Sequence, residues 1–181
     1  TRSALVNKNY ASIVSFVEIL GVQQIKQLAF SIHGIELDQS QAEVVSVLTN
    51  GIFIEVSDFM AELINKKKKE ESKEMTAAAI FERAYSSYYR KLFPVYDQNL
   101  KDFKAIHCKQ QSQLDEFLTV IQFVIAGDEK RNVTKNYMFD YNLIIKLDSN
   151  GGVKFMARNK IAESVLSDEY YRQEIDSTLA I

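Results

Sequence analysis

Apolar residues recur at helical spacing on both sides of one glycine, Gly21, near the start of the chain. Before the glycine they fall at Ile13, Phe16, Val17, Ile19 and Leu20, and after it at Val22, Ile25, Leu28, Ala29 and Ile32. Spacings of three and four residues place such side chains on one face of a helix. We therefore expect helices over about residues 9–20 and 22–34, each with an apolar stripe that another element must cover.

A third apolar stripe indicates a long helix over about residues 39–66, with Asp38 or Ser40 as its N-cap. Its apolar positions are Val44, Val45, Val47, Leu48, Ile52, Val56, Phe59, Met60, Leu63 and Ile64. Gly51 costs a helix about 1 kcal/mol relative to alanine, so we expect a kink or a break there. The charged block KKKKEE at 66–71 should end the helix and form a hydrated linker.

Residues 74–92 again have helical spacing. Their side chains available for burial are Met75, Ala78, Ala79, Phe81, Tyr85, Tyr88 and Tyr89. Pro94 is the only proline in the chain, and it should end this helix because it lacks an N–H and its ring clashes with the preceding turn. Two further helices are expected over residues 95–106 and 112–126, the second closed by Gly127.

Beyond residue 127 the spacing of apolar residues changes from that of a helix to that of a strand. Apolar residues alternate with polar ones from Phe139 onward, and again after the turn sequence SNGG; they are Tyr141, Leu143, Ile145 and Leu147, then Val153, Phe155 and Ala157. A two-residue loop would pair Leu147 with Lys154, whereas a three-residue loop pairs Leu147 with Phe155. We favour the three-residue loop because it keeps apolar side chains opposite each other on one face.

A helix over residues 161–179 completes a mainly α-helical fold. We predict a helical bundle with a C-terminal β-hairpin packed on it, and an α+β fold is the alternative. A lone hairpin is marginal in water, so the hairpin needs the helices as a support. We expect two regions: a helical region over residues 1–109, and a region over residues 110–181 that holds a helix, the hairpin and the final helix and packs on the first.

The composition is that of a folded domain of ordinary charge. The 181 residues are 46% hydrophobic and 11% aromatic, which is enough for a substantial core. A formal charge of −2 produces no field that would attract nucleic acid. No apolar run approaches the roughly 20 residues needed to cross a bilayer, and no N-terminal segment resembles an export signal, so we expect a cytoplasmic protein without membrane contact.

Candidate catalytic residues are few. The chain has two histidines, His33 and His107, and one cysteine, Cys108. A lone cysteine excludes an internal disulfide and a cysteine-based zinc cluster, and a metal-bound water needs several histidine or carboxylate ligands around one ion. His107 and Cys108 are adjacent, and adjacent residues of a helix point about 100° apart. We therefore predict neither catalysis nor metal binding at these residues.

Acidic pairs occur at residues 70–71, 115–116 and 168–169, in hydrophilic contexts typical of hydrated helix surfaces. No glycine-rich phosphate-binding motif of the GxGxxG or GxxxxGK[ST] type is present. The sequence therefore predicts no catalytic residue, no metal and no cofactor. The alternative of an enzyme is a metal-independent hydrolase whose dispersed acids meet only in the folded structure.

The segment ILGVQQIKQLAFSI at 19–32 is also similar to a helix–turn–helix, with Gly21 at the turn. Gln23, Gln24 and Lys26 would then reach into a DNA groove. Such a helix needs neighbouring cations for the DNA phosphates, and this part of the chain has few of them. A DNA-binding regulator is therefore our first alternative, and we do not expect nucleic acid as the partner.

The order of these features resembles the bacterial HDOD domains, helical relatives of HD-type phosphohydrolases that usually lack the metal site. The resemblance covers about residues 3–106. It rests on SIVSFVEILGVQQIKQLAFSI at 12–32, anchored by the Ile-Leu-Gly at 19–21, on the long helix through Gly51, and on AIFERAYSSYYRKLFP at 79–94.

In this resemblance Phe81 and Glu82 stand at the positions of the family's His-Asp pair, and Ala84 stands at the glycine that follows. The metal-binding pair is therefore absent from the matching positions. The resemblance implies a non-catalytic signalling or regulatory module of a bacterial cytoplasmic protein, which works by protein contacts. We accordingly expect a protein partner that docks on an exposed apolar or aromatic surface.

Overall fold

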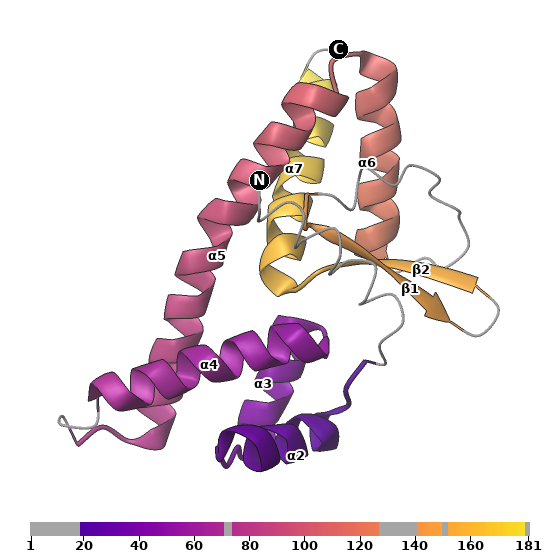
Figure 1. Cartoon of the computed structure of the whole chain (residues 1–181). Helices are drawn as coiled ribbons and strands as arrows, with labels where there is room; N and C mark the ends of the chain where they lie inside the picture. Colours follow the sequence, from indigo (N-terminus) through magenta and orange to yellow (C-terminus); the bar gives the residue numbers. More distant parts are fainter. Residues whose placement is uncertain (1–18, 71–73, 127–140, 150–151, 180–181) are drawn as a thin grey trace. The chain divides into compact units, whose positions relative to one another are not determined.

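The computed structural model describes residues 19–70, 74–126, 141–149 and 152–179 (Figure 1). These residues form six helices and one two-stranded antiparallel hairpin near the C-terminus. The predicted fold class, mainly α-helical with a hairpin, is confirmed. The contacts divide the chain into two compact units, residues 18–92 and residues 1–17 with 93–181, which we call the 18–92 unit and the 93–181 unit.

The 18–92 unit contains α2 (Val22–His33), α3 (Gln39–Thr49), α4 (Phe53–Glu70) and the first part of α5 (Ala77–His107). Helix α2 packs on α3 and α4, and α3 packs on α4. The residues they bury include Ile25, Ala29, Ala42, Val45, Leu48, Val56, Phe59 and Met60. The helix predicted over residues 22–34 is confirmed, whereas nearly all of the one predicted over residues 9–20 lies outside the described residues.

The helix predicted over residues 39–66 is two helices, broken at the expected glycine. Asn50 and Gly51 separate α3 from α4 with φ angles of 54° and 70°. The Leu20 N–H donates to the Gly51 carbonyl at 2.8 Å, and a Cβ on Gly51 would lie 2.5 Å from the Leu20 carbonyl oxygen. Residue 51 must therefore be a glycine, because both its left-handed backbone and the passing chain exclude a side chain.

The prediction that Pro94 ends a helix is wrong. Helix α5 runs without interruption from Ala77 to His107, so the helices expected over residues 74–92 and 95–106 are one element that contains Pro94. A proline inside a helix costs about 3 kcal/mol. Pro94 itself is exposed, while the helix buries aromatic side chains on both sides of it, Tyr88 and Tyr96. The tertiary contacts of these flanking turns outweigh the local cost.

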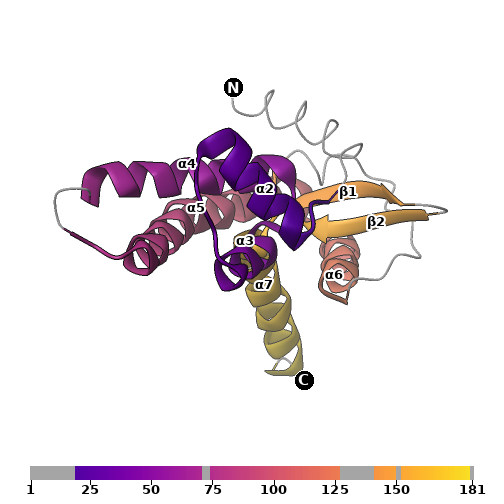
Figure 2. The same ribbon diagram turned by 90° about the horizontal axis from the view of Figure 1, so that it is seen from below.

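The 93–181 unit contains the rest of α5, then α6 (Gln111–Ala126), β1 (Ile144–Ser149), β2 (Gly152–Ala157) and α7 (Lys160–Leu179). Strand β2 contacts α6 and α7, and these two helices contact each other; both views show the hairpin beside α6 (Figures 1 and 2). The hairpin packs on helices, as predicted. The domain boundary expected at residues 109–110 falls between α5 and α6 inside this unit, and that division of the chain stays a prediction.

The predicted register of the hairpin is wrong. Leu147 lies opposite Lys154 and Ser149 opposite Gly152, which leaves two residues between the strands instead of three. The buried base of the hairpin explains this register, because it places Ile144 opposite Ala157, both buried. The sequence Asn-Gly at 150–151 is also the one that two-residue hairpin turns prefer.

Candidate functional site

An aromatic cluster fixes α5 to α4 in the 18–92 unit. The ring of Phe59 makes edge-to-face contacts with Phe81 and with Tyr88, each with 5.5 Å between ring centroids. All three rings are at least nine-tenths buried. Edge-to-face pairs of this kind add to the stabilisation that comes from burial, so the cluster holds the two helices in a defined relation.

Three carboxylates of α4 face this interface. The Tyr88 hydroxyl donates to Glu55 at 2.9 Å, Lys91 donates to Glu62 at 2.6 Å, and Arg83 donates to Glu70 at 2.9 Å. The three acids are 2%, 8% and 7% exposed. The prediction of a hydrated acid pair at 70–71 is therefore wrong for Glu70, which a cation of α5 neutralises.

The pKa of the Glu62 carboxyl reflects its contacts with Lys91 and Ser87. Burial acts to raise the pKa of this carboxyl, but hydrogen bonds from Lys91 and Ser87 and the charge of Lys91 outweigh it, so the pKa lies below its usual value. The ion pairs on this side of α5 also hold two of its cations, Arg83 and Lys91, against α4.

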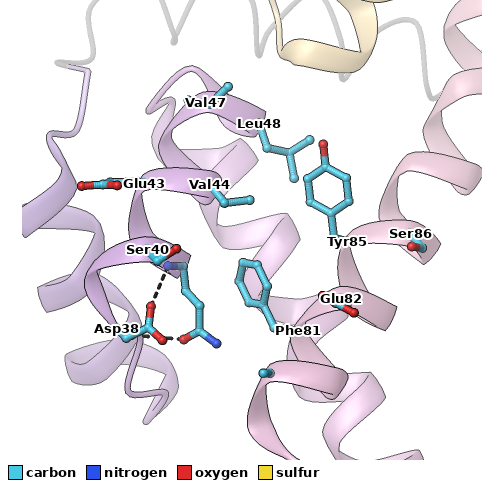
Figure 3. A pocket seen from close by; sticks show the side chains of 12 residues that line it. Asp38, Ser40, Glu43, Val44, Val47, Leu48, Phe81, Glu82, Tyr85 and Ser86 are labelled. Atoms are coloured by element: carbon cyan, nitrogen blue, oxygen red, sulfur yellow. Dashed lines mark hydrogen bonds between the residues drawn. The ribbon is translucent and has the colours of Figure 1, made fainter.

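A groove of about 810 Å³ lies between α3 and α5, inside the same unit (Figure 3). Its apolar lining consists of Val44, Val47 and Leu48 from α3 and Ala78, Phe81 and Tyr85 from α5. The rings of Phe81 and Tyr85 project from α5 into the space beside α3 (Figure 3). Leu48 and Phe81 form a buried floor, whereas Val47 is 62% exposed. The groove therefore offers water an apolar surface that side chains of another molecule could cover.

The charged residues among the described ones that line this groove are all acidic: Asp38, Glu43 and Glu82. Asp38 is the N-cap of α3, as one of the two predicted positions, and accepts a hydrogen bond from the Gln41 N–H at 2.8 Å. Glu43 points away from α5, and the three carboxylates do not turn towards one another (Figure 3). They do not form the paired acids that hydrolytic catalysis uses.

Two adjacent residues to which the sequence resemblance drew attention line this groove. Phe81 and Glu82, at the positions of the HDOD family's His-Asp pair, both line it, Phe81 as part of the floor and Glu82 as an exposed residue. No group of three or more histidine, cysteine, aspartate or glutamate residues in the described parts of the chain could hold a metal ion.

The histidine and the cysteine at the end of α5 lie in different surroundings. The His107 ring packs against Phe103 and Tyr141, with centroids 5.2 and 5.7 Å apart. Burial raises the pKa of the Cys108 thiol, and the charge of Glu169 adds to this while that of Lys104 opposes it. A raised pKa favours the thiol over the reactive thiolate.

A buried acid also anchors α7 in the 93–181 unit. Glu169 is 3% exposed, accepts a hydrogen bond from Lys104 and lies 3.5 Å from Arg172. The expectation of a hydrated pair at 168–169 therefore holds for the exposed Asp168 and is wrong for Glu169.

The residues of the DNA-binding alternative are engaged within the 18–92 unit. Gln24 caps its own helix by accepting a hydrogen bond from the Gly21 N–H at 2.8 Å, and Gln23 donates to Gln39 at 3.2 Å. Lys26 is half-buried. The structure thus gives two of these three side chains a local role in holding α2.

The sequence pattern predicts the apolar residues that line the groove but not the groove itself. Val44 and Val47 belong to the apolar face predicted over residues 39–66, and Phe81 and Tyr85 are among the side chains predicted to be available for burial. An apolar position in a helical stripe does not reveal whether a neighbour covers it. The buried acids had a weak signal: Glu55 and Glu62 are seven residues apart, on one face of α4 with Phe59.

Comparison with known proteins gives no relative: no family model, no curated protein and no solved structure matches the chain. The resemblance to HDOD domains accordingly stays a prediction. None of the helices in the described residues is long and apolar enough to cross a membrane.

Proposed function

We propose that this protein is a non-catalytic signalling or regulatory module that acts by binding another protein, with the groove between α3 and α5 as its docking surface. The observation that carries the proposal is the groove's apolar lining, with Val44 37% and Val47 62% exposed above a buried floor. Apolar surface gathered in a hollow commonly marks a site of interaction. The resemblance to HDOD domains supports the same class of function and a bacterial cytoplasmic location.

The chemistry of the described residues also favours binding over catalysis. The acids of the groove are separated, and Cys108 has a raised pKa. The buried acids Glu62, Glu70 and Glu169 have cations beside them, which is the pattern of ion pairs that hold helices together.

A selection of binding peptides tests the proposal. The full chain is immobilised, a random-peptide display library is passed over it, and enriched peptides are measured by fluorescence anisotropy. We expect enriched peptides whose binding weakens by about tenfold or more in Val47→Asn, a loss of about 1.4 kcal/mol. Ile32→Asn is the matched control, because Ile32 is also 62% exposed but lies on α2 outside the groove lining.

The outcome against the proposal is equally definite. Peptides that bind wild type, Val47→Asn and Ile32→Asn alike would place binding elsewhere, and a library without enriched peptides would remove the support for docking. Phosphodiesterase or nucleotidase turnover by the pure, metal-supplemented protein, abolished in His33→Ala or His107→Ala, would overturn the non-catalytic assignment.

A further inference from the structure

The groove between α3 and α5 has a charge that differs from that of the chain as a whole. Asp38, Glu43 and Glu82 contribute three negative formal charges, and the described residues that line the groove include no lysine, arginine or histidine. The whole chain carries a formal charge of only −2, with 22 basic and 24 acidic residues. The lining is therefore net negative, whereas acidic and basic residues nearly balance in the chain as a whole.

The ion pairs of α5 help to explain why the lining is net negative. Glu82 and Arg83 are neighbours in sequence and so point about 100° apart on the helix. Arg83 binds Glu70 of α4, and Lys91 binds Glu62 of α4. These two cations of α5 thus bind acids of α4, whereas Glu82 lines the groove as well as the neighbouring pocket that Arg83 and Arg90 line.

The apolar lining has the dimensions of a helix face. It follows two helical rows, residues 44 to 48 on α3 and residues 78 to 85 on α5. The longer row spans eight residues, and its first and last residues are seven steps apart, which is about 10 Å of helix at 1.5 Å per step. An amphipathic helix that presents apolar side chains at positions i, i+3 or i+4, and i+7 covers the same length.

We infer that the groove binds an amphipathic helix of a partner protein, whose apolar anchors are flanked by lysine or arginine. This inference rests on the proposed function. The apolar anchors cover Val44, Val47 and Tyr85, and the flanking cations lie near Asp38 and Glu82. Electrostatic complementarity of this kind speeds association and rejects partners of the wrong charge.

A second copy of this chain fits the groove less well. The most regular exposed apolar row of the described residues is on α7, at Tyr171, Ile175 and Leu179. The exposed acids Glu174 and Asp176 flank this row, and the cation that also flanks it, Arg172, lies 3.5 Å from Glu169. A helix with these acids would meet the carboxylates of the groove with like charge, which opposes binding.

The test uses the peptides selected on the full chain whose binding is lost in Val47→Asn. We expect them to carry lysine or arginine beside apolar residues at helical spacing, to gain helical circular dichroism when bound, and to bind more weakly as salt rises. Replacing their basic residues by glutamine should weaken binding about tenfold or more, which is the discrimination expected of several surface charges together.

A change on the protein side gives an independent readout. Glu82→Gln should weaken the binding of the basic peptides about threefold, which is the size of effect that one surface charge can have. The binding of their glutamine-substituted versions should not change. Glu36→Gln is the matched control, since Glu36 is an exposed acid of the same unit outside the groove lining. An equal effect of both variants would show a general field of the protein rather than a groove contact and would overturn the inference.

Different results would overturn the basic-helix inference and the proposed docking function. Groove-dependent peptides that lack basic residues, that bind as extended strands, or that ignore Glu82→Gln would overturn the basic-helix inference while the docking function stands. Dimerisation of the free chain that Val47→Asn abolishes would assign the groove to a second copy. If no selected peptide depends on Val47, the proposed function fails together with the inference.

Discussion

The two units attach a helix to α5 by different interactions. In the 18–92 unit, α4 meets α5 through the rings of Phe59, Phe81 and Tyr88, and its ion pairs join nearly buried acids to exposed cations, with the Lys91 side chain 60% exposed. In the 93–181 unit, α7 meets α5 through Glu169 and Lys104, whose side chains are only 3% and 30% exposed.

Asn159 adds a neutral bond to the second attachment. Its amide donates to the Tyr96 hydroxyl at 2.7 Å, and its side-chain oxygen accepts from the Ala162 N–H at 2.9 Å at the start of α7.

The two attachments are two ways of holding a second helix against α5. The first attachment should respond to the size of a side chain, because it depends on packing, and the second to charge, because a buried acid without its partner is strongly destabilising.

The largest effect should come from removing the ring at the centre of the first attachment. Phe59 is fully buried, and Phe59→Ala should lower the free energy of unfolding by about 3–5 kcal/mol. Phe30→Ala removes a ring that is 66% exposed and should change it by about 0.5 kcal/mol or less. Urea denaturation followed by circular dichroism measures both, and similar losses for the two variants would contradict a packing-dominated attachment.

Lys104→Met tests the second attachment and should cost about 2–3 kcal/mol, because Glu169 then keeps a buried charge beside the exposed cation Arg172 and the neutral Gln173 amide, which donates to it at 3.0 Å. The double variant Lys104→Met with Glu169→Leu should recover most of the loss. Lys101→Met, which breaks an exposed pair with Asp97, should cost about 0.5 kcal/mol or less. A double variant as unstable as the single one would show that packing, and not charge, dominates here too.

Pro94→Ala tests the junction between the two attachments. The substitution removes a proline from the interior of α5, so we expect the free energy of unfolding to rise by about 1 kcal/mol. This is less than the roughly 3 kcal/mol difference in helix propensity between proline and alanine, because the surrounding contacts are adapted to the proline. Val95→Ala, next to it and 49% exposed, serves as the control. A loss of stability in Pro94→Ala would mean that the units need the local geometry which proline imposes.

The smallest change in the free energy of unfolding should come from the ion pair between Glu62 and Lys91 in the first attachment. Since the pKa of Glu62 lies below its usual value of 4.5 in the folded protein, its ionised form contributes stability above that value, and this contribution disappears as the pH falls through the folded pKa. Glu62→Gln should therefore cost about 0.5–1 kcal/mol at pH 7, and its stability should converge with that of wild type in acid. A constant difference between pH 7 and 3 in urea titrations would contradict this coupling.

Local signals in the sequence were sufficient for most elements of the fold. The apolar stripes predicted α2, α3, α4 and α6, the glycine at residue 51 predicted the break, and the alternating residues predicted the hairpin. They failed at Pro94 and at the hairpin register, because a local propensity or a pairing of neighbouring side chains can be overruled by contacts with distant residues. The candidate site could not be predicted, because a groove exists only where two helices leave apolar residues uncovered.

By itself, the sequence determined where most of the helices lie, where a glycine interrupts one of them, and that the chain has only two histidines and one cysteine. These properties depend on residue type and on spacing along the chain. Only the tertiary structure decided that α5 continues through Pro94, that Glu55, Glu70 and Glu169 are buried, and that the acids of the groove remain apart. The physical reason is that burial and pairing depend on which residues distant in sequence become neighbours, and only packing sets that.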